Sequence, residues 1–253
     1  MKNILVHVDG GARSSDRLRL AVGLAQARGA RLVGLFGQLA SPHRVGVIAS
    51  WPSDAYLQMA EASREAFAAA AAALPESHWR DANRGSSLAI GEVVGDAARC
   101  FDLVILGQGE DGAAPDIAAA VLARSGRPAL VIPAVGDFPA LGRSPMLVWD
   151  ESPAAARALH EALPLLSASM SPLLAVLTEG SVDLERTEQI DAQLRSHGIT
   201  ARIEHVAMGE SSAADVILNR AADLGADLLV SGWSDKYGPA LLHHLTVPAL
   251  LSW

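Results

Sequence analysis

The segment Ala226-Asp227-Leu228-Leu229-Val230-Ser231-Gly232 places an apolar run between an aspartate and a glycine, and the chain contains this pattern twice. Its counterpart is Phe101-Asp102-Leu103-Val104-Ile105-Leu106-Gly107. A short apolar run bounded by turn-forming residues is typical of a buried strand. A Gly-Glu pair and a short helical segment precede each run, at 91–92 and 209–210. The chain is therefore predicted to contain two copies of one structural unit.

Other segments of the two halves match in the same order. A strand predicted at 4–8 corresponds to one at 146–149, and a closing strand at 129–132 corresponds to one at 249–252. The second copy is shorter, and we expect the length differences in surface loops. These matches predict a first domain at residues 1–136 and a second, shortened domain at residues 145–253. Residues 137–144, which show no periodicity, are predicted to be the linker.

Strands and helices alternate within each copy. In the first, the strand at 4–8 leads through Asp9-Gly10-Gly11 into an apolar-faced helix, and Gly29 ends that helix before a strand at 31–36. This order predicts a βαβ unit with parallel strands, and hence an α/β fold. Further elements are expected as a long helix at 53–74, a weak third strand at 79–84 or 86–90, and a short helix at 93–100. The segment between Gly232 and Pro248 can keep a helix or form only a turn.

Composition argues against several classes of partner. The 253 residues carry a net charge of −8, whereas binding to nucleic acid or to an anionic membrane needs a basic surface. No apolar stretch reaches the roughly 18 residues of a membrane-spanning helix, and no signal peptide is recognisable. Cys100 is the single cysteine, which fits a reducing, cytoplasmic setting.

The chain resembles the universal stress protein family in its tandem two-domain form. The resemblance rests on a first strand that ends in Val8-Asp9, on Ala226–Gly232, and on the closing Thr246–Leu251, and it covers nearly the whole chain. It implies two open five-stranded parallel sheets with helices on both faces, of the adenine nucleotide alpha hydrolase-like type. It also implies ligand sites beyond the carboxyl ends of the strands. Asp9, Gly107, Asp150 and Gly232 would lie at these ends.

The resemblance breaks down at the phosphate-binding loop. Family members that bind ATP or AMP follow the fourth strand with Gly-x2-Gly-x9-Gly-Ser/Thr, in which glycines let the backbone approach phosphate. The corresponding positions are Glu110, Ala120 and Val121 in the first copy, and Asp235, Leu245 and Thr246 in the second. We therefore expect degenerate nucleotide sites and no cofactor.

If one site still binds ATP or AMP, two sets of residues are the candidates. The first set is Asp9, Gly107 and Gly109, and the second is Asp150, Gly232 and Ser234. Each aspartate could bond a ribose or an adenine-side group, or could cap the following helix. A slow ATPase is the catalytic variant of this alternative.

Several other motifs allow a second interpretation. Residues 107–112 match Gly-x-Gly-x-x-Gly, but two acidic residues stand where phosphates need donors. Asp9–Ser15 resembles a pyrophosphatase-type loop, although a turn with a serine cap for the next helix explains it more simply. His7 and Asp9 could form an acid/base pair, or His7 could be a buried, hydrogen-bonded residue. Trp149, Trp233 and Tyr237 could stack on a planar ligand or fill space.

The leading hypothesis is a non-enzymatic stress-response or regulatory protein that acts by binding an unknown protein or a small metabolite. The two copies would pack as an intramolecular pseudo-dimer through their fifth strands, and a homodimer stays open. No Cys-x-x-Cys pair, nucleophile elbow or His/carboxylate spacing predicts a catalytic or metal site.

Overall fold

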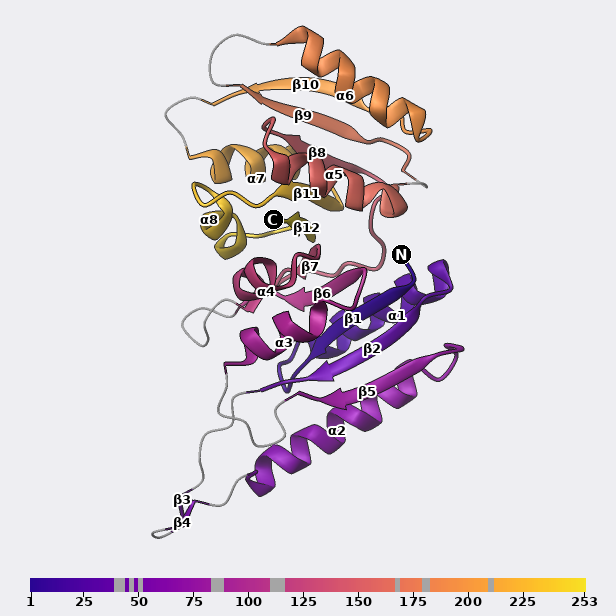
Figure 1. Ribbon diagram of the computed structural model, residues 1–253, viewed down its shortest axis with the longest axis vertical. Helices are drawn as coiled ribbons and strands as arrows, with labels where there is room; N and C mark the ends of the chain where they lie inside the picture. Colours follow the sequence, from indigo (N-terminus) through magenta and orange to yellow (C-terminus); the bar gives the residue numbers. More distant parts are fainter. Residues whose placement is uncertain are drawn as a thin grey trace. The chain divides into compact units, whose positions relative to one another are not determined.

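The computed structural model describes residues 1–38, 44–45, 48–49, 52–82, 89–109, 117–166, 169–178, 183–208 and 212–253 (Figure 1). The chain forms two compact units, Met1–Arg127 and Pro128–Trp253. The predicted linker at 137–144 lies inside the second unit, so the domain limits of 1–136 and 145–253 stay a prediction.

The first unit is a parallel sheet of the order β6-β1-β2-β5. A separate antiparallel pair, β3 with β4, lies in the excursion after β2. The elements are β1 (Asn3–Val8), α1 (Ser14–Arg28), β2 (Arg31–Phe36), β3 (Arg44–Val45), β4 (Ile48–Ala49), α2 (Asp54–Ala70), β5 (Ser77–Asp81), α3 (Ile90–Ala98), β6 (Leu103–Gly107) and α4 (Ile117–Ser125).

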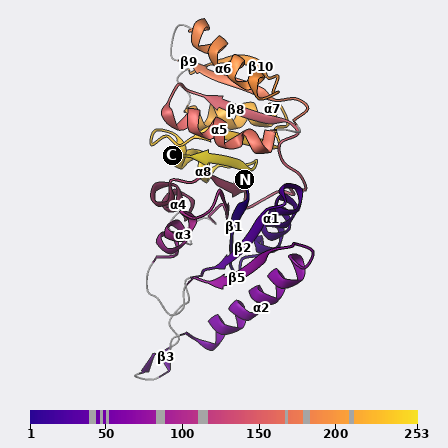
Figure 2. The ribbon, with the colours of Figure 1, turned by 45° about the vertical axis from the view of Figure 1, so that its right-hand side comes forward.

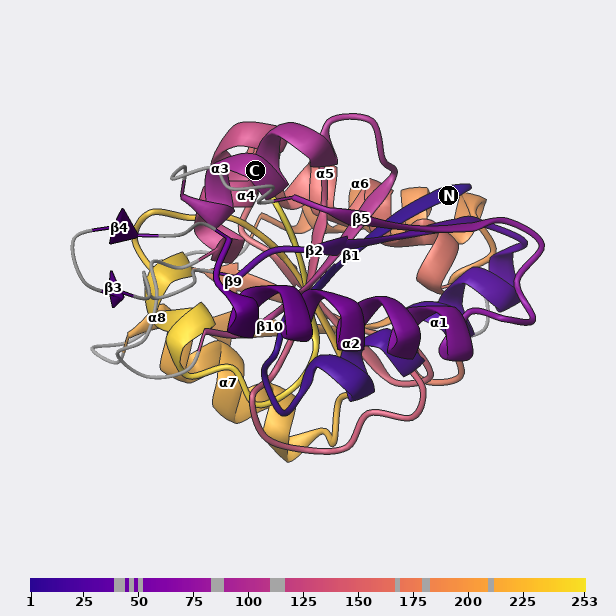
Figure 3. The same cartoon turned by 90° about the horizontal axis from the view of Figure 1, so that it is seen from below.

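Helices cover both faces of the first sheet. Figures 2 and 3 show α1 and α2 on one side of β1, β2 and β5, and α3 and α4 on the other. The strands are therefore buried on both faces, which is why the last five residues of β1 and of β2 are all buried and mostly apolar instead of alternating. Helix α2 approaches β2 closely at Gly34, where a Cβ atom would lie 2.5 Å from the ring of Phe67. Gly29 ends α1 in the left-handed conformation, with φ of 54°.

The second unit repeats this architecture and adds two strands to the sheet. Its parallel strands run in the order β10-β9-β8-β11-β12, and β7 pairs antiparallel with β12. The elements are β7 (Ala129–Ile132), β8 (Pro145–Trp149), α5 (Pro153–Leu166), β9 (Leu173–Thr178), α6 (Leu184–Ser196), β10 (Arg202–Ala207), α7 (Ala213–Asp223), β11 (Leu228–Gly232), α8 (Gly238–His243) and β12 (Ala249–Ser252).

The predicted α/β class with two tandem parallel sheets is confirmed. The structure corrects one detail of the prediction and decides between the alternatives for two others. Strand β7, expected as the fifth strand of the first sheet, is grouped with the second unit, where its backbone bonds to β12. The third strand is β5, at the first of the two expected places, while 83–88 lie outside the described residues. The short segment after Gly232 keeps a helix of six residues, α8.

One contact occurs in both units at matching positions. The carboxylate of Asp102, just before β6, accepts hydrogen bonds from the backbone N–H groups of Lys2 and Asn3 at the start of β1. Asp227, just before β11, accepts bonds of 2.8 and 3.0 Å from the N–H groups of Arg143 and Ser144 before β8. These bonds satisfy amides at the start of the central strand and fix the neighbouring strands in register.

Candidate functional site

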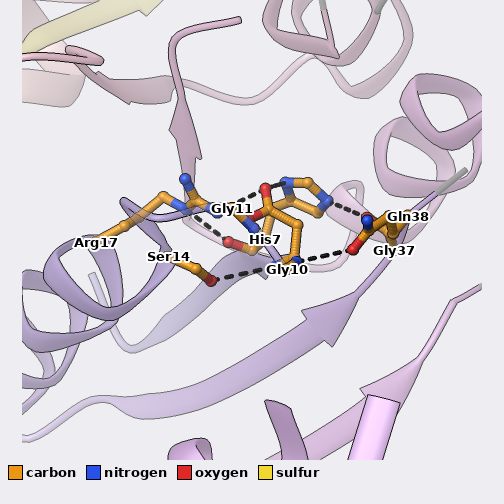
Figure 4. Close-up of polar contacts among 8 residues, drawn as sticks. His7, Gly10, Gly11, Ser14, Arg17, Gly37 and Gln38 are labelled. Carbon is orange, nitrogen blue, oxygen red and sulfur yellow. Dashed lines mark hydrogen bonds and ion pairs between the residues drawn. The ribbon is translucent and has the colours of Figure 1, made fainter. Parts of the chain in front are cut away.

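The first candidate site lies where β1 ends and α1 begins, and we call it the first strand-end site. It consists of His7, Asp9, Arg17, Gly37 and Gly107. Figure 4 shows His7, Arg17 and Gly37 at this place. Parallel strands bring their carboxyl ends to one edge of the sheet, so residues from β1, β2 and β6 meet here.

Arg17 is the centre of this site. Its side chain is only 4% exposed, although it carries a full positive charge. Nε donates to the carbonyl oxygen of His7 over 2.7 Å, and Nη2 donates to Oδ2 of Asp9 over 2.8 Å (Figure 4). A buried guanidinium is tolerated when a carboxylate and a carbonyl accept its N–H groups. Arg17 thus ties α1 to the end of β1.

Asp9 has both carboxylate oxygens in internal hydrogen bonds. Oδ1 accepts from the N–H of Gly11 over 2.9 Å, while Oδ2 accepts from Arg17. Burial alone would raise the pKa of Asp9, but the Arg17 charge, His7 and the Gly11 amide outweigh it and lower the pKa below its usual value. Asp9 therefore stays ionised and is bound to Arg17.

His7 is buried and lies 3.7 Å from Asp9, measured from Nδ1 to Oδ2. Nε2 lies 2.8 Å from the carbonyl oxygen of Gly37, and because a carbonyl only accepts, Nε2 carries the proton. Burial, together with the Arg17 charge, lowers the pKa of His7. A neutral, buried histidine is the simpler of the two interpretations of this pair, and the geometry fits it.

Two glycines follow β6 in this site. A Cβ atom on Gly107 would lie 2.3 Å from Nη1 of Arg17, so the absent side chain makes room for the guanidinium. Among the described residues, no atom lies within 4 Å of the Cβ position of Gly109. Residues 110–116, which include Glu110 and the rest of the Gly-x-Gly-x-x-Gly match, lie outside the described residues. Ala120 and Val121 lie inside α4.

The second strand-end site is built around Asp150, which directly follows β8. Its Oδ1 accepts from the N–H of Ser152 over 3.0 Å, and its Oδ2 accepts from the hydroxyl of Tyr237 over 2.9 Å. Tyr237 lies between β11 and α8 and is 7% exposed. Burial and the Asp150 charge raise the pKa of Tyr237 far above its usual value, so the hydroxyl stays protonated and donates.

The other predicted residues of this second site have local partners. A Cβ atom on Gly232 would lie 2.3 Å from the backbone nitrogen of Ala155, so the start of α5 packs directly on this glycine. Ser234 Oγ accepts from the N–H of Lys236, and its carbonyl accepts from Gly238. The hydrogen bonds described for Ser234 do not reach Asp150.

Neither the collection of protein-family models nor the curated proteins contains a match to this chain. Solved structures do match over its whole length. A universal stress protein from Archaeoglobus fulgidus DSM 4304 superposes with a TM-score of 0.71 at 14% identity, covering 99% of this chain and 95% of the other. The chain has the universal stress protein fold.

Two further structures share the universal stress protein fold with this chain. One is a protein assigned to the universal stress proteins from Pseudomonas aeruginosa UCBPP-PA14, with a TM-score of 0.59, 16% identity, and coverage of 100% and 93%. The other is a functionally unknown protein from Pseudomonas aeruginosa PAO1, with a TM-score of 0.56, 16% identity, and coverage of 100% and 92%. At these identities the likeness establishes the fold.

Within this fold, sequence reasoning found both aspartates but missed Arg17. The available signal was its spacing, because Arg17 lies four and eight residues before the buried Ala21 and Ala25, and so on the apolar face of α1. Ser14 or Ser15 was expected to cap α1, and this is wrong because both lie inside the helix. The Ncap residue is Arg13, which makes no side-chain cap bond, while Ser14 Oγ accepts from the N–H of Asp9.

The aromatic residues of the second unit were expected either to stack on a ligand or to fill space. Tyr237 points inward to Asp150, and Trp233 stacks on Trp253 with ring centroids 6.0 Å apart. Gly238 packs on the Trp233 ring, 3.0 Å from its Cβ position. The rings of Trp233 and Trp253 therefore contact each other, and the Trp233 ring also contacts the backbone of Gly238.

Within the described part of the chain, no helix is long and apolar enough to cross a membrane. The same residues contain no group of three or more His, Cys, Asp or Glu side chains that could bind a metal ion.

Proposed function

We propose that this chain is a universal stress protein-like regulatory protein that acts by binding, and whose two nucleotide sites are degenerate. The observation that carries the proposal concerns Gly107 and Gly232, the last residues of β6 and β11: other atoms of the protein lie directly against both glycines. Nη1 of Arg17 lies against Gly107, and the backbone of Ala155 lies against Gly232, each 2.3 Å from the Cβ position. A glycine in a phosphate-binding loop serves to let phosphate approach the backbone. Here the protein's own atoms take up that space.

The connection after β11 supports the same conclusion for the second unit. It contains only the six-residue helix α8 before β12 begins at Ala249. A longer helix with free N–H groups at its start is the usual anion site of such loops. At the start of α8, the N–H of Gly238 instead donates to the carbonyl of Ser234 over 2.6 Å, and the next residue, Pro239, has no N–H.

We infer a binding role rather than catalysis, because the polar side chains at both sites are engaged in internal hydrogen bonds. His7 donates to Gly37, Asp9 binds Arg17, and Asp150 binds Tyr237. An unknown protein or a small metabolite is the proposed partner, in a cytoplasmic setting. The antiparallel pairing of β7 with β12 supports a pseudo-dimer in which the fifth strands of the two copies meet. The proposal leaves a homodimer open.

The alternative is an ATP- or AMP-binding protein with slow ATPase activity. The half-buried Asp150 favours it. It would use Asp150, Gly232 and Ser234, or Asp9, Gly107 and Gly109.

Calorimetric titration of nucleotide-free protein with ATP and AMP, with and without Mg²⁺, separates the two functions. We expect no heat of binding and an unchanged melting temperature at millimolar nucleotide, because ligands that bind the native state raise that temperature. A universal stress protein known to bind ATP serves as the positive control. Micromolar binding would refute the degenerate sites and establish the alternative.

A further inference from the structure

The hydroxyl of Tyr237 donates a hydrogen bond to the carboxylate of Asp150. The phenol comes from the connection between β11 and α8, is 7% exposed, and donates to Oδ2 over 2.9 Å. The other carboxylate oxygen accepts from the Ser152 amide. A half-buried carboxylate without such donors would lose the hydrogen bonds that water provides. Tyr237 supplies the donor that the site requires.

The first unit meets the same requirement with a different residue. Asp9 binds the guanidinium of Arg17, which belongs to the helix after the first strand of that unit. Tyr237 follows the fourth parallel strand of the second copy, so the two partners occupy non-corresponding positions of the repeat. The two aspartates are therefore bound by residues that do not correspond in the repeat.

We propose that Tyr237 is an internal ligand of Asp150, which closes the second strand-end site against ligands that present hydroxyl or amino donors. A sugar hydroxyl or an amino group has to displace the phenol before it can bond to Asp150. The inference rests on the proposed function, in that it treats the strand-end site as a former ligand site.

The test uses the full chain and two substitutions of Tyr237. Tyr237→Phe removes only the hydroxyl and leaves the ring packing, whereas Tyr237→Ala also removes the ring. The chain has two tyrosines, and Tyr56 provides the matched control because its hydroxyl donates to Asp81 over 2.7 Å in the other unit. Tyr56→Phe therefore removes a bond of the same kind at another aspartate. Adenosine and AMP are the probes, and calorimetry measures their affinity for each protein. Thermal unfolding verifies that each variant is folded.

We expect Tyr237→Phe to bind AMP or adenosine with an affinity at least about tenfold above the upper limit that calorimetry sets for the wild type and for Tyr56→Phe. The reason is that the ligand no longer has to break a hydrogen bond to a charged acceptor. Folded Tyr237→Phe and Tyr237→Ala proteins with no gain in affinity would overturn the inference and leave the proposed function intact. A wild type that binds AMP at micromolar concentration, with a further tenfold gain in the variant, would refute the degenerate site but support the internal ligand. Micromolar binding that neither substitution changes would refute both.

Discussion

His7 lies between the charges of Asp9 and Arg17, with its ring buried and its Nε2 proton donated to Gly37. Burial and Arg17 lower its pKa in the folded protein, whereas the unfolded chain has the ordinary value of about 6.5. Below pH 6.5 the unfolded state takes up a proton that the folded state does not. Stability must therefore fall as the pH drops through 6.5, down to the folded pKa.

We predict that His7→Gln removes this component of the pH dependence, because an amide can still donate to Gly37 but does not titrate. The free energy of unfolding of the wild type should fall by up to about 1.4 kcal/mol per pH unit between pH 6.5 and the folded pKa. Urea unfolding at pH 7.5 and 5.5 measures the difference. Gln58→Ala, at an exposed residue of α2 that does not titrate, should keep the wild-type slope. Equal slopes in all three proteins would show that His7 titrates normally in the folded state.

At the scale of elements, the two aspartates before β6 and β11 hold the start of the central strand in each unit. Asp102 bonds to the amides of Lys2 and Asn3, and Asp227 bonds to those of Arg143 and Ser144. The Lys2 amide is the main cause of the lowered pKa of Asp102. The stability that Asp102 contributes is thus present above about pH 4 and is lost as the pH falls through its folded pKa.

We predict that Asp102→Asn and Asp227→Asn each reduce the free energy of unfolding by roughly 1 to 2 kcal/mol at pH 7, because an amide accepts these two bonds less well than a carboxylate. Chemical denaturation gives the values. The exposed Asp223 is the control, and Asp223→Asn should change stability by less than about 0.5 kcal/mol. For Asp102 the difference should shrink below pH 4. A loss confined to one of the two positions would contradict an equivalent role in both copies.

The elements themselves could be predicted because their signals are local. Apolar runs such as Leu103–Leu106 and Leu228–Val230 predicted strands, and Gly29 predicted the end of α1. The partners of Asp9 and Asp150 could not be predicted in this way. The spacing of Arg17 places it on the apolar face of α1, but its partners are set only when α1 packs on β1. Tyr237 reaches Asp150 only through the fold, 87 residues along the chain. The antiparallel pairing of β7 likewise depends on tertiary structure, because the four apolar residues of a strand do not specify their neighbour.

At the scale of the whole molecule, the short strand β7 makes the first copy depend on the second for a pairing partner. It is encoded after the first four strands of the first copy, yet it bonds to β12 at the end of the second. Ala129, Leu130 and Val131 are fully buried and pair with Leu251, Leu250 and Ala249. Removing the second copy would leave the unpaired N–H and C=O groups of β7 along an apolar edge. Such edges pair with other chains.

We therefore predict that a fragment of residues 1–140 associates with itself, whereas the full chain at the same molar concentration does not associate through β7. Because β7 pairs antiparallel with β12, two copies of β7 could pair with each other in the same way, around a twofold axis. Size-exclusion chromatography with light scattering measures the mass, and far-UV circular dichroism shows whether the fragment retains α/β structure. A dimer or larger species is the expected result. A folded fragment that stays monomeric at high concentration would show that β7 needs no partner strand, and the argument for a pseudo-dimer built on the fifth strands would then fail.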